Sequence, residues 1–403
     1  MQRIPLRNVQ GRLLASVAAL LLAACGGGGG GGSAPPADLA AAGQEIFRYD
    51  TFGDEARWTD TLRMHEVIEQ GVSPATALAV GLKVDAEAIP PDLAAAIRAG
   101  NVDMNSPATT VALIKLDAVV GLKGEVENVN GVDRLRRVGI TCALCHSTVD
   151  DSFAQGIGKR LDGWANRDLD PGAIIALSPA IDAGRKAIYR SWGKGRYDPR
   201  FNVDGISKPV VIPPAYGLAG IHKVTYTGDG DSPAYWNRYV AVVQMGGQGS
   251  FSDPRLPLSV TNGTQDLVSP KLPALEAYQL SLPPPPAPAG SFDAAAAARG
   301  KLLFAGTAQC ATCHGGALFT DANSRLHPPA DSMAEPENPS YASRSATKMY
   351  RTTPLRGAWQ HAPYFHDGSA ATLDAVAERY NQRLGLGLSA QDVADLAQYL
   401  KSL

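Results

Sequence analysis

Two short motifs constrain this sequence more than any other feature. Each motif has two cysteines separated by two residues, with a histidine directly after the second cysteine. The first consists of Cys142, Cys145 and His146, and the second consists of Cys310, Cys313 and His314. Four of the five cysteines in the chain belong to these motifs. We therefore expect two similar chemical sites, one in each half of the chain.

The spacing within each motif suits the covalent attachment of haem. Two thiols two residues apart form thioethers with the two vinyl groups at one edge of the haem, and the adjacent histidine becomes an axial ligand of the iron. A zinc site needs four ligands gathered together, whereas these motifs lie in separate halves of the chain. A thioredoxin-like cysteine pair does not require a histidine beside it, and here the histidine occurs twice. The sequence predicts two c-type haems, with His146 and His314 as iron ligands.

The N-terminus is typical of an export signal. A basic segment (residues 1–12) precedes an apolar core (13–22), which is shorter than the about 20 apolar residues of a membrane-spanning helix. The core leads into Cys25 through a sequence that resembles the lipobox of bacterial lipoproteins. We expect residues 1–24 to be removed and Cys25 to be lipidated, and an ordinary signal with an incidental cysteine is the alternative. We therefore expect the protein to lie in the periplasm or outer cell envelope and to contact the membrane only through this lipid anchor.

A proline-rich linker, residues 283–291, divides the remaining sequence. A flexible tether rich in glycine and proline occupies residues 25–37. We predict a first haem domain at 38–282 and a second cytochrome c domain at 292–403. The two predicted domains therefore contain one cysteine motif each.

The predicted domains begin and end with similar sequences. Near their starts, segments 43–47 and 300–304 both run from a glycine to a phenylalanine. Near their ends, segments 275–282 and 396–403 share leucine, tyrosine, serine and a final leucine at the same offsets. Each domain is therefore expected to end in the same kind of helix.

The first domain contains an insertion at roughly residues 48–139. Cys310 follows the glycine–phenylalanine segment of its domain closely, whereas Cys142 lies far beyond the equivalent segment. Proline at the first helical position predicts helices that start at Pro91 and Pro107. The predicted fold is mainly α, with two cytochrome c-like haem domains of which the first carries a helical insertion.

Four stretches of the second domain carry a family resemblance. They are residues 304–314, 353–356, 362–368 and 371–376. Through them the domain resembles the bacterial dihaem cytochrome c peroxidase superfamily, which includes the dihaem enzyme that matures methylamine dehydrogenase. The resemblance implies that the second haem receives electrons from a small cytochrome or copper protein. It also implies that the first haem reduces peroxide or oxygen, and that calcium binds between the domains.

The resemblance also suggests the sixth iron ligand of the second haem. Peroxidases of this family use a methionine, and the matching position here is Tyr380, as in the methylamine dehydrogenase maturation enzyme. Tyrosine is a known haem ligand, and an anionic phenolate favours ferric iron. Met349 is another candidate, and a tyrosine without a ligand role is the alternative for Tyr380.

The first domain departs from the family pattern. Family peroxidases place a glutamate over the first haem, but no glutamate occurs between His146 and Pro270. An aspartate, or a glutamate of the insertion, is the possible substitute, so the catalytic residues stay unknown. Met245 and His222 are the candidates for the sixth ligand of this haem, with ordinary packing as the alternative for each.

Other side chains have plausible roles around the haems. Three arginines are candidates for pairing with haem propionates: Arg160, Arg167 and Arg356. Three tryptophans are candidates for assisting electron transfer between the haems: Trp164, Trp236 and Trp359. Solvated arginines and packed tryptophans are the alternatives. Residues 227–231 resemble a calcium loop but lack its twelve-residue ligand spacing, so a turn is expected there.

Net charge narrows the functional classes. The formal charge is −2, without the strongly basic balance of a nucleic-acid-binding domain. The leading hypothesis is electron transfer in the cell envelope by a dihaem oxidoreductase related to the peroxidases. The alternatives are a non-catalytic carrier with both irons six-coordinate, and a redox or gas sensor.

Overall fold

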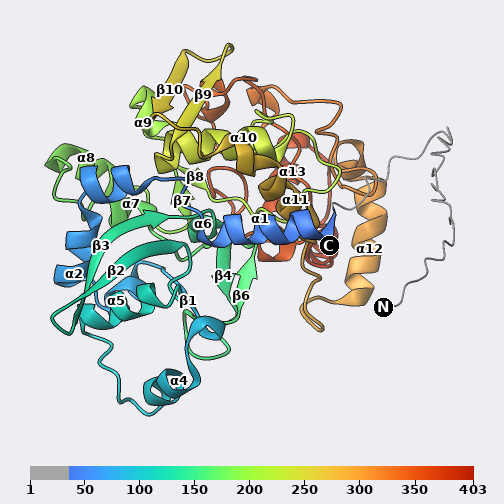
Figure 1. Ribbon diagram of the computed structural model, residues 1–403. Helices are drawn as coiled ribbons and strands as arrows, with labels where there is room; N and C mark the ends of the chain where they lie inside the picture. Colours follow the sequence, from blue (N-terminus) through green and yellow to red (C-terminus); the bar gives the residue numbers. More distant parts are fainter. Residues whose placement is uncertain (1–35) are drawn as a thin grey trace, which may run out of the picture. The chain divides into compact units, whose positions relative to one another are not determined.

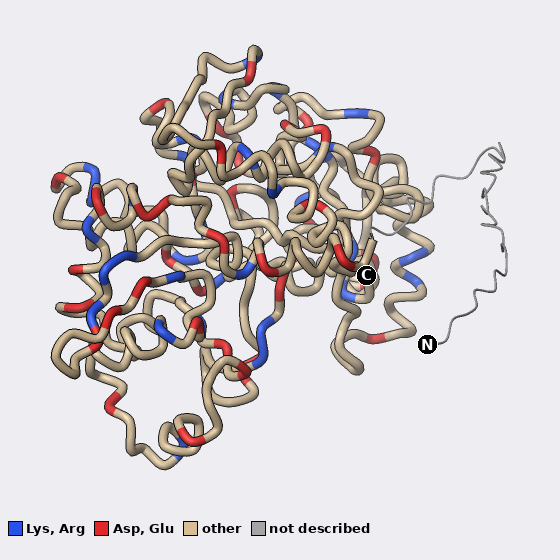
Figure 2. The backbone as a smooth tube through the Cα atoms, in the orientation of Figure 1, with Lys and Arg blue, Asp and Glu red and all other residues tan. Residues whose placement is uncertain are grey.

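The computed structural model describes residues 36–403. The predicted signal segment and Cys25 lie outside these residues, as does the predicted tether up to residue 35. Within residues 36–403, no helix is both long and apolar enough to cross a membrane. Acidic and basic residues are interspersed along this part of the chain, as Figure 2 shows.

Two helix pairs occupy equivalent places in the two halves. Helix α1 (Ala37–Tyr49) packs against α11 (Leu272–Ser281), and α12 (Ala294–Ala305) packs against α14 (Ala390–Lys401). These four helices contain the sequence segments that repeat between the halves. The repeat therefore corresponds to a repeated helix contact, and the terminal helix of each half is confirmed.

A glycine permits the close approach in each pair. A Cβ atom on Gly43 would lie 1.9 Å from the carbonyl oxygen of Ala274. A Cβ atom on Gly300 would lie 2.0 Å from the carbonyl oxygen of Asp395. Because both distances are far inside van der Waals contact, any side chain at these positions would push the helices apart.

An aromatic pair fills the space beside each glycine contact. The rings of Phe47 and Tyr278 meet edge to face with centroids 5.5 Å apart. The rings of Phe304 and Tyr399 meet in the same way at 5.2 Å. Such edge-to-face pairs stabilise a core beyond the area that they bury.

The insertion is only partly helical. Its helices are α2 (Met64–Gly71), α3 (Pro74–Ala79), α4 (Pro91–Arg98) and α5 (Pro107–Lys115). The predicted helix starts at Pro91 and Pro107 are confirmed. Figure 1 shows α2 and α5 beside a long hairpin, at the opposite end of the body from α12.

That hairpin was missed by the prediction of a helical insertion. Strands β2 (Leu122–Val129) and β3 (Val132–Ile140) pair antiparallel through an Asn130-Gly131 turn. Both turn residues have positive φ, 53° and 84°, which suits the tight turn of a hairpin. The asparagine–glycine pair is itself a strong hairpin signal, so the sequence did contain the information.

The other strands pair in twos. Among the described residues, the remaining sheets are β1 (Val84–Asp85) with β5 (Ile157–Gly158), β4 (Ser147–Val149) with β6 (Arg160–Asp162), β7 (Arg196–Tyr197) with β8 (Val210–Val211), and β9 (Gly249–Asp253) with β10 (Leu258–Asn262). These short pairs connect loops, and the helices provide most of the regular structure.

The remaining helices surround these loops. They are α6 (Ala143–His146), α7 (Pro171–Ile175), α8 (Ala183–Arg190), α9 (Phe201–Asp204), α10 (Pro233–Tyr239), which continues into a π-helical turn (Val240–Met245), and α13 (Leu373–Leu384). The mainly helical class is consistent with this inventory.

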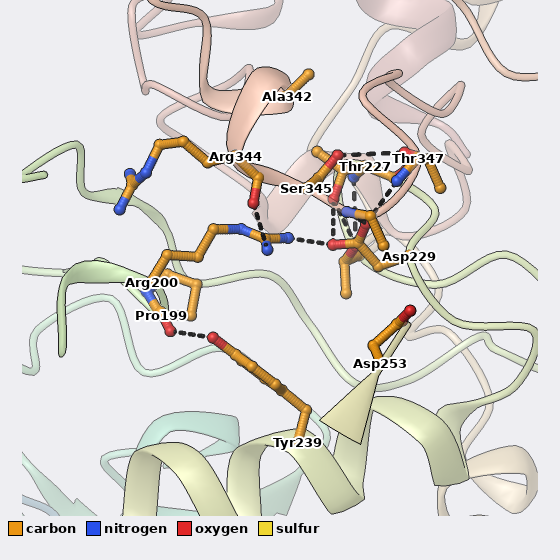
Figure 3. Close-up of polar contacts among 12 residues, drawn as sticks. Pro199, Arg200, Thr227, Asp229, Tyr239, Asp253, Ala342, Arg344, Ser345 and Thr347 are labelled. Carbon is orange, nitrogen blue, oxygen red and sulfur yellow. Dashed lines mark hydrogen bonds and ion pairs between the residues drawn. The ribbon is translucent and has the colours of Figure 1, made fainter. Parts of the chain in front are cut away.

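Buried charges tie the two halves together (Figure 3). Arg200 donates to the carboxylate of Asp229 and, at 2.8 Å, to the carbonyl oxygen of Arg344. The Arg344 guanidinium in turn pairs with Asp198 at 3.0 Å. The backbone amide of Ala346 donates to Asp229 at 3.0 Å. Because these groups are buried, breaking one partner would leave an uncompensated charge, so the cluster fixes how the halves meet.

The same cluster explains the sequence at 227–231. The Asp229 carboxylate is occupied by Arg200, the hydroxyl of Thr227 at 2.8 Å and backbone amides of the second half. The segment is thus a turn that supports the contact between the halves, as expected. Its central carboxylate is saturated by donors, which leaves it unsuited to a calcium ion.

The glycine contact between α12 and α14 yields a stability prediction. We expect Gly300→Ala to lower the free energy of unfolding by about 1–3 kcal/mol, because the new methyl group overpacks the crossing. Urea unfolding followed by circular dichroism measures this change. Gly71→Ala is the matched control, since nothing lies within 4 Å of a Cβ there. Equal stability of the two variants would contradict the described crossing.

Candidate functional site

The first motif is held where the hairpin ends. Strand β3 leads directly into Cys142, which precedes helix α6. The Nδ1 atom of His146 lies 3.0 Å from the carbonyl oxygen of Pro213. With Nδ1 donating to that carbonyl, Nε2 is left without a proton and available to a metal. Burial lowers the pKa of His146 to about 4, so the ring stays neutral.

The second motif reproduces this arrangement. The Nδ1 atom of His314 lies 3.1 Å from the carbonyl oxygen of Phe319. Burial also lowers the pKa of His314. A carbonyl partner of this kind fixes both the tautomer and the orientation of a metal-binding imidazole. Both predicted axial histidines are therefore oriented as iron ligands require.

The four motif cysteines are free thiols in the structure. Burial raises the pKa of Cys142 and of Cys145 to about 12, and that of Cys310 to about 11. The thiols of Cys142, Cys145 and Cys310 are thus neutral, and all four cysteines are unpaired. This state is compatible with thioether formation and offers no support for a disulfide reading of the cysteines.

A cavity of about 620 Å³ lies beside the second motif. Its wall includes Cys310, Cys313 and His314 together with Tyr380 of α13 and Leu396 of α14. The volume is within the range of pockets that enclose whole cofactors. The second motif therefore faces a space suited to a group as large as haem.

Two buried arginines in the cavity wall test whether the residues fit haem. The Nε and Nη1 atoms of Arg167, and Nε of Arg351, are buried without a hydrogen-bond partner. Burial lowers the pKa of Arg351 to about 10 and also lowers that of Arg167. Buried cations require an anionic partner, and the two propionates of haem supply one. The cavity fits haem, which when bound supplies the redox-active iron.

The three arginines predicted to pair with haem propionates lie in different surroundings. Arg167 lines the cavity, as that role requires. Arg160 is instead buried against Asp85 at 3.0 Å. Arg356 belongs to the cavity wall but is exposed. Arg351 was missed by the sequence reasoning, since its position before the 353–356 stretch does not reveal which way its side chain packs.

The candidates for the sixth ligand of the second haem are also separated. Tyr380 lines the cavity with the second motif, and burial raises its pKa. Met349 is half-buried, whereas Met333, which the sequence reasoning did not single out, lies in the cavity wall. Ligation by Tyr380 stays a prediction, with Met333 as the methionine placed beside the same space.

The two candidates for the sixth ligand of the first haem differ in placement. Met245 is buried in the same apolar cluster that Cys142 packs against. Its carbonyl oxygen accepts a hydrogen bond of 3.0 Å from the indole of Trp58. His222 is exposed, and its amide donates to Asn323 at 2.8 Å. The structure thus brings Met245 into the core around the first motif, and ligation by either residue stays a prediction.

The insertion places a buried carboxyl group near the first motif. Asp54 is fully buried, and its carboxyl accepts from the amide of Ile140 in β3 at 3.3 Å. Burial, with a further contribution from Glu55, raises the pKa of Asp54 well above its ordinary value. The insertion therefore contributes a buried carboxyl group with a raised pKa, hydrogen-bonded to Ile140, which precedes Cys142 by two residues in the strand that leads to the motif.

An aromatic chain connects the two halves. Trp164 of the first half meets Trp359 of the second half at a centroid distance of 5.7 Å and meets Tyr216 at 6.4 Å. Trp164 follows Gly163, whose amide donates to the carbonyl oxygen of His146 at 2.8 Å. Trp236 instead stacks on Tyr239 within the first half. Of the three predicted tryptophans, Trp164 and Trp359 therefore meet where the halves join.

Comparison with known proteins agrees with this site. The RoxA-like cytochrome c family matches residues 349–384, which include Tyr380. A cytochrome c551 peroxidase of Pseudomonas aeruginosa is 32% identical over 148 residues, covering 32% of this chain and 42% of that protein. The resemblance to the dihaem peroxidase superfamily is confirmed. The chain spans less than half the length of this relative, and the likeness supports a c-type cytochrome.

Two solved structures show a weak similarity over part of this chain. A Kuenenia stuttgartiensis hydrazine synthase is 19% identical with a TM-score of 0.35, covering 53% of this chain and 78% of that chain. A MauG-like protein associated with microbial copper homeostasis is 22% identical with a TM-score of 0.33, covering 50% of this chain and 75% of that chain.

Tyr380 can be tested by a single substitution. We expect Tyr380→Phe to change the absorption and paramagnetic resonance spectra of the second haem and to leave those of the first unchanged. The reason is that the substitution removes the phenolate oxygen from the iron of the second haem and does not alter the first haem. Tyr364→Phe, which alters another tyrosine of the same cavity wall, is the control and should leave both spectra unchanged. Identical spectra for Tyr380→Phe and the unmodified protein would exclude Tyr380 as a ligand.

The buried arginine predicts a shift in redox potential. Arg351→Gln should lower the reduction potential of the second haem, because a buried positive charge favours the ferrous over the ferric iron. Spectroelectrochemical titration measures the potential of each haem. Arg356→Gln removes an exposed charge from the same wall and should have a much smaller effect, since solvent screens it. An equal shift in both variants would contradict a specific role for Arg351.

Proposed function

We propose that this chain is a dihaem electron-transfer oxidoreductase of the cell envelope, with one haem on each cysteine motif. The observation that carries the proposal is the repeated geometry of the axial histidines. Each histidine is half-buried and donates from Nδ1 to a backbone carbonyl, which leaves Nε2 available to an iron. A structural histidine does not require this repeated arrangement beside two cysteines.

The cavity beside the second motif supports a share in this function for that motif. Its apolar wall and its two buried guanidinium groups suit a planar anionic cofactor with little exposure to water. Enclosure of this kind reduces the solvent reorganisation that accompanies a change of charge on the iron. The second haem is thus proposed as the electron-entry centre, with a small cytochrome or copper protein as the donor.

Electrons would pass between the haems through the aromatic contact of Trp164 and Trp359. Both indoles lie where the halves meet, and the Trp359 indole donates to the carbonyl oxygen of Pro285 at 3.2 Å. The buried charges around Arg200 and Asp229 hold this junction in place. The halves therefore act as one rigid support for two redox centres.

The proposed function has an enzymatic version and a carrier version, which differ in the chemistry of the first haem. In the enzymatic version, peroxide or oxygen is reduced at this haem, and Asp54, a buried acid with a raised pKa that binds the strand leading to Cys142, is the proposed substitute for the family's glutamate. In the carrier version, Met245 fills the sixth position. The burial of Met245 in the cluster around Cys142 is the observation that favours the carrier.

The proposed location rests on the N-terminal sequence. Lipidation at Cys25 would anchor the protein in the periplasm or outer cell envelope, where c-type haems are attached. The family resemblance also suggests calcium between the halves. That ion would need ligands other than Asp229, whose carboxylate already accepts from Arg200, Thr227 and Ala346.

Haem content and peroxide reactivity test the proposal together. The purified protein should contain two haems by the pyridine haemochrome assay, and Cys310→Ser combined with Cys313→Ser should leave one. Paramagnetic resonance of the ferric protein should show one high-spin haem that changes on addition of hydrogen peroxide. Two low-spin haems inert to peroxide would support the carrier instead. A protein that binds no covalent haem would contradict both versions.

A further inference from the structure

A hydrogen-bonded tyrosine and histidine lie beside the aromatic chain between the halves. The hydroxyl of Tyr216 lies 3.0 Å from Nε2 of His361. Tyr216 comes from the first half and is 4% exposed, while His361 comes from the second half. Both line the cavity beside the second motif. The pair therefore joins the junction of the halves to the proposed haem site.

The surroundings fix the direction of this hydrogen bond. Burial raises the pKa of Tyr216 and lowers that of His361 to about 3, with Arg167 contributing to the second effect. Both side chains are consequently neutral, with the phenol as proton donor and the imidazole as acceptor. Arg167 also holds the histidine by donating to its carbonyl oxygen at 2.9 Å.

The other contacts of the hydroxyl do not offer a base. The side chain of Gln360 donates to the Tyr216 oxygen, and the carbonyl oxygen of Gly357 lies 3.3 Å away. An amide donor and a backbone carbonyl cannot take up a proton at neutral pH, whereas a neutral imidazole can. His361 is thus the group in contact that can accept the phenolic proton.

We propose that Tyr216 is a redox-active tyrosine whose proton passes to His361 when it is oxidised. One electron leaves the phenol for an oxidised haem, and the hydroxyl proton moves to Nε2, so a neutral tyrosyl radical and an imidazolium form. Reduction returns the electron to Tyr216 and the proton to its oxygen. The oxidant is a haem that has reacted with a peroxide, so in the cell this role rests on the proposed function.

Proton transfer is what makes the oxidation feasible at this position. A phenol that has lost an electron is a far stronger acid than an imidazolium, even one whose pKa burial lowers to about 3, so its proton passes to the hydrogen-bonded His361 and the oxidation becomes easier. The contact with Trp164 places Tyr216 within reach of charge that moves along the aromatic chain. Tyr364 provides the contrast, since its hydroxyl donates at 3.0 Å to the carbonyl oxygen of Ala358.

The test uses the haem-loaded protein and a photochemical oxidant. Illumination with a ruthenium polypyridyl complex and persulfate, followed by freezing, should give a tyrosyl signal in paramagnetic resonance. The signal should narrow when ring-deuterated tyrosine is incorporated. Tyr216→Phe should abolish it, His361→Gln should remove most of it, and Tyr364→Phe should retain it. Haem content and circular dichroism establish that each variant is folded.

A signal that persists in Tyr216→Phe, or that narrows with labelled tryptophan instead, would overturn the proposal. The same samples are then treated with hydrogen peroxide in the dark. If the haem spectrum changes but the Tyr216 signal is missing after both treatments, the tyrosine assignment fails and the proposed function stands. If light produces the Tyr216 signal while the haems ignore peroxide, the enzymatic version of the proposed function fails and the tyrosine assignment stands.

Discussion

The contact of helices at a bare glycine is the constraint on which each half of this protein depends. At Gly43 and at Gly300, a backbone carbonyl of the partner helix occupies the space that any side chain would need. The close approach sets the position of the phenylalanine that follows one turn later, and with it the apolar wall beside each cysteine motif. In the first half, the carboxylate of Asp162 strengthens the arrangement by accepting from Arg48 of α1 and Tyr278 of α11, both at 2.6 Å.

A second constraint operates between the halves. Arg344 of the second half pairs with the buried Asp198 of the first, and the Ala346 amide donates to the buried Asp229, so the halves cannot separate without exposing or orphaning charges. This rigidity allows the first half to complete a site that belongs to the second. Arg167 and Tyr216 reach the cavity beside Cys310 from the far side of the junction. The second site is therefore a property of the whole body, although its motif and terminal helices belong to one half.

The two sites differ in what surrounds them. The second has a large cavity with unpaired buried cations, and its sequence matches a cytochrome family over residues 349–384. The first motif follows a hairpin and an insertion that carries a buried acid, Asp54, whose pKa is raised by burial. A carboxyl group held neutral by burial is a proton donor, whereas an ionised one is not. The surroundings of the two motifs therefore differ through residues that the sequence repeat does not include.

Much of the site was predictable from local sequence. The spacing of Cys142 and Cys145 before His146 specifies a chemistry because it is set by covalent geometry, and the helix starts at Pro91 and Pro107 follow from the fixed φ of proline. The hairpin was also predictable from a local signal, the Asn130-Gly131 pair, but the predicted insertion was helical and did not include it. Arg351, Met333 and the pairing of Tyr216 with His361 were not predictable. Which buried side chains meet across a junction depends on the packing of segments far apart in the chain, and only the tertiary structure decides that.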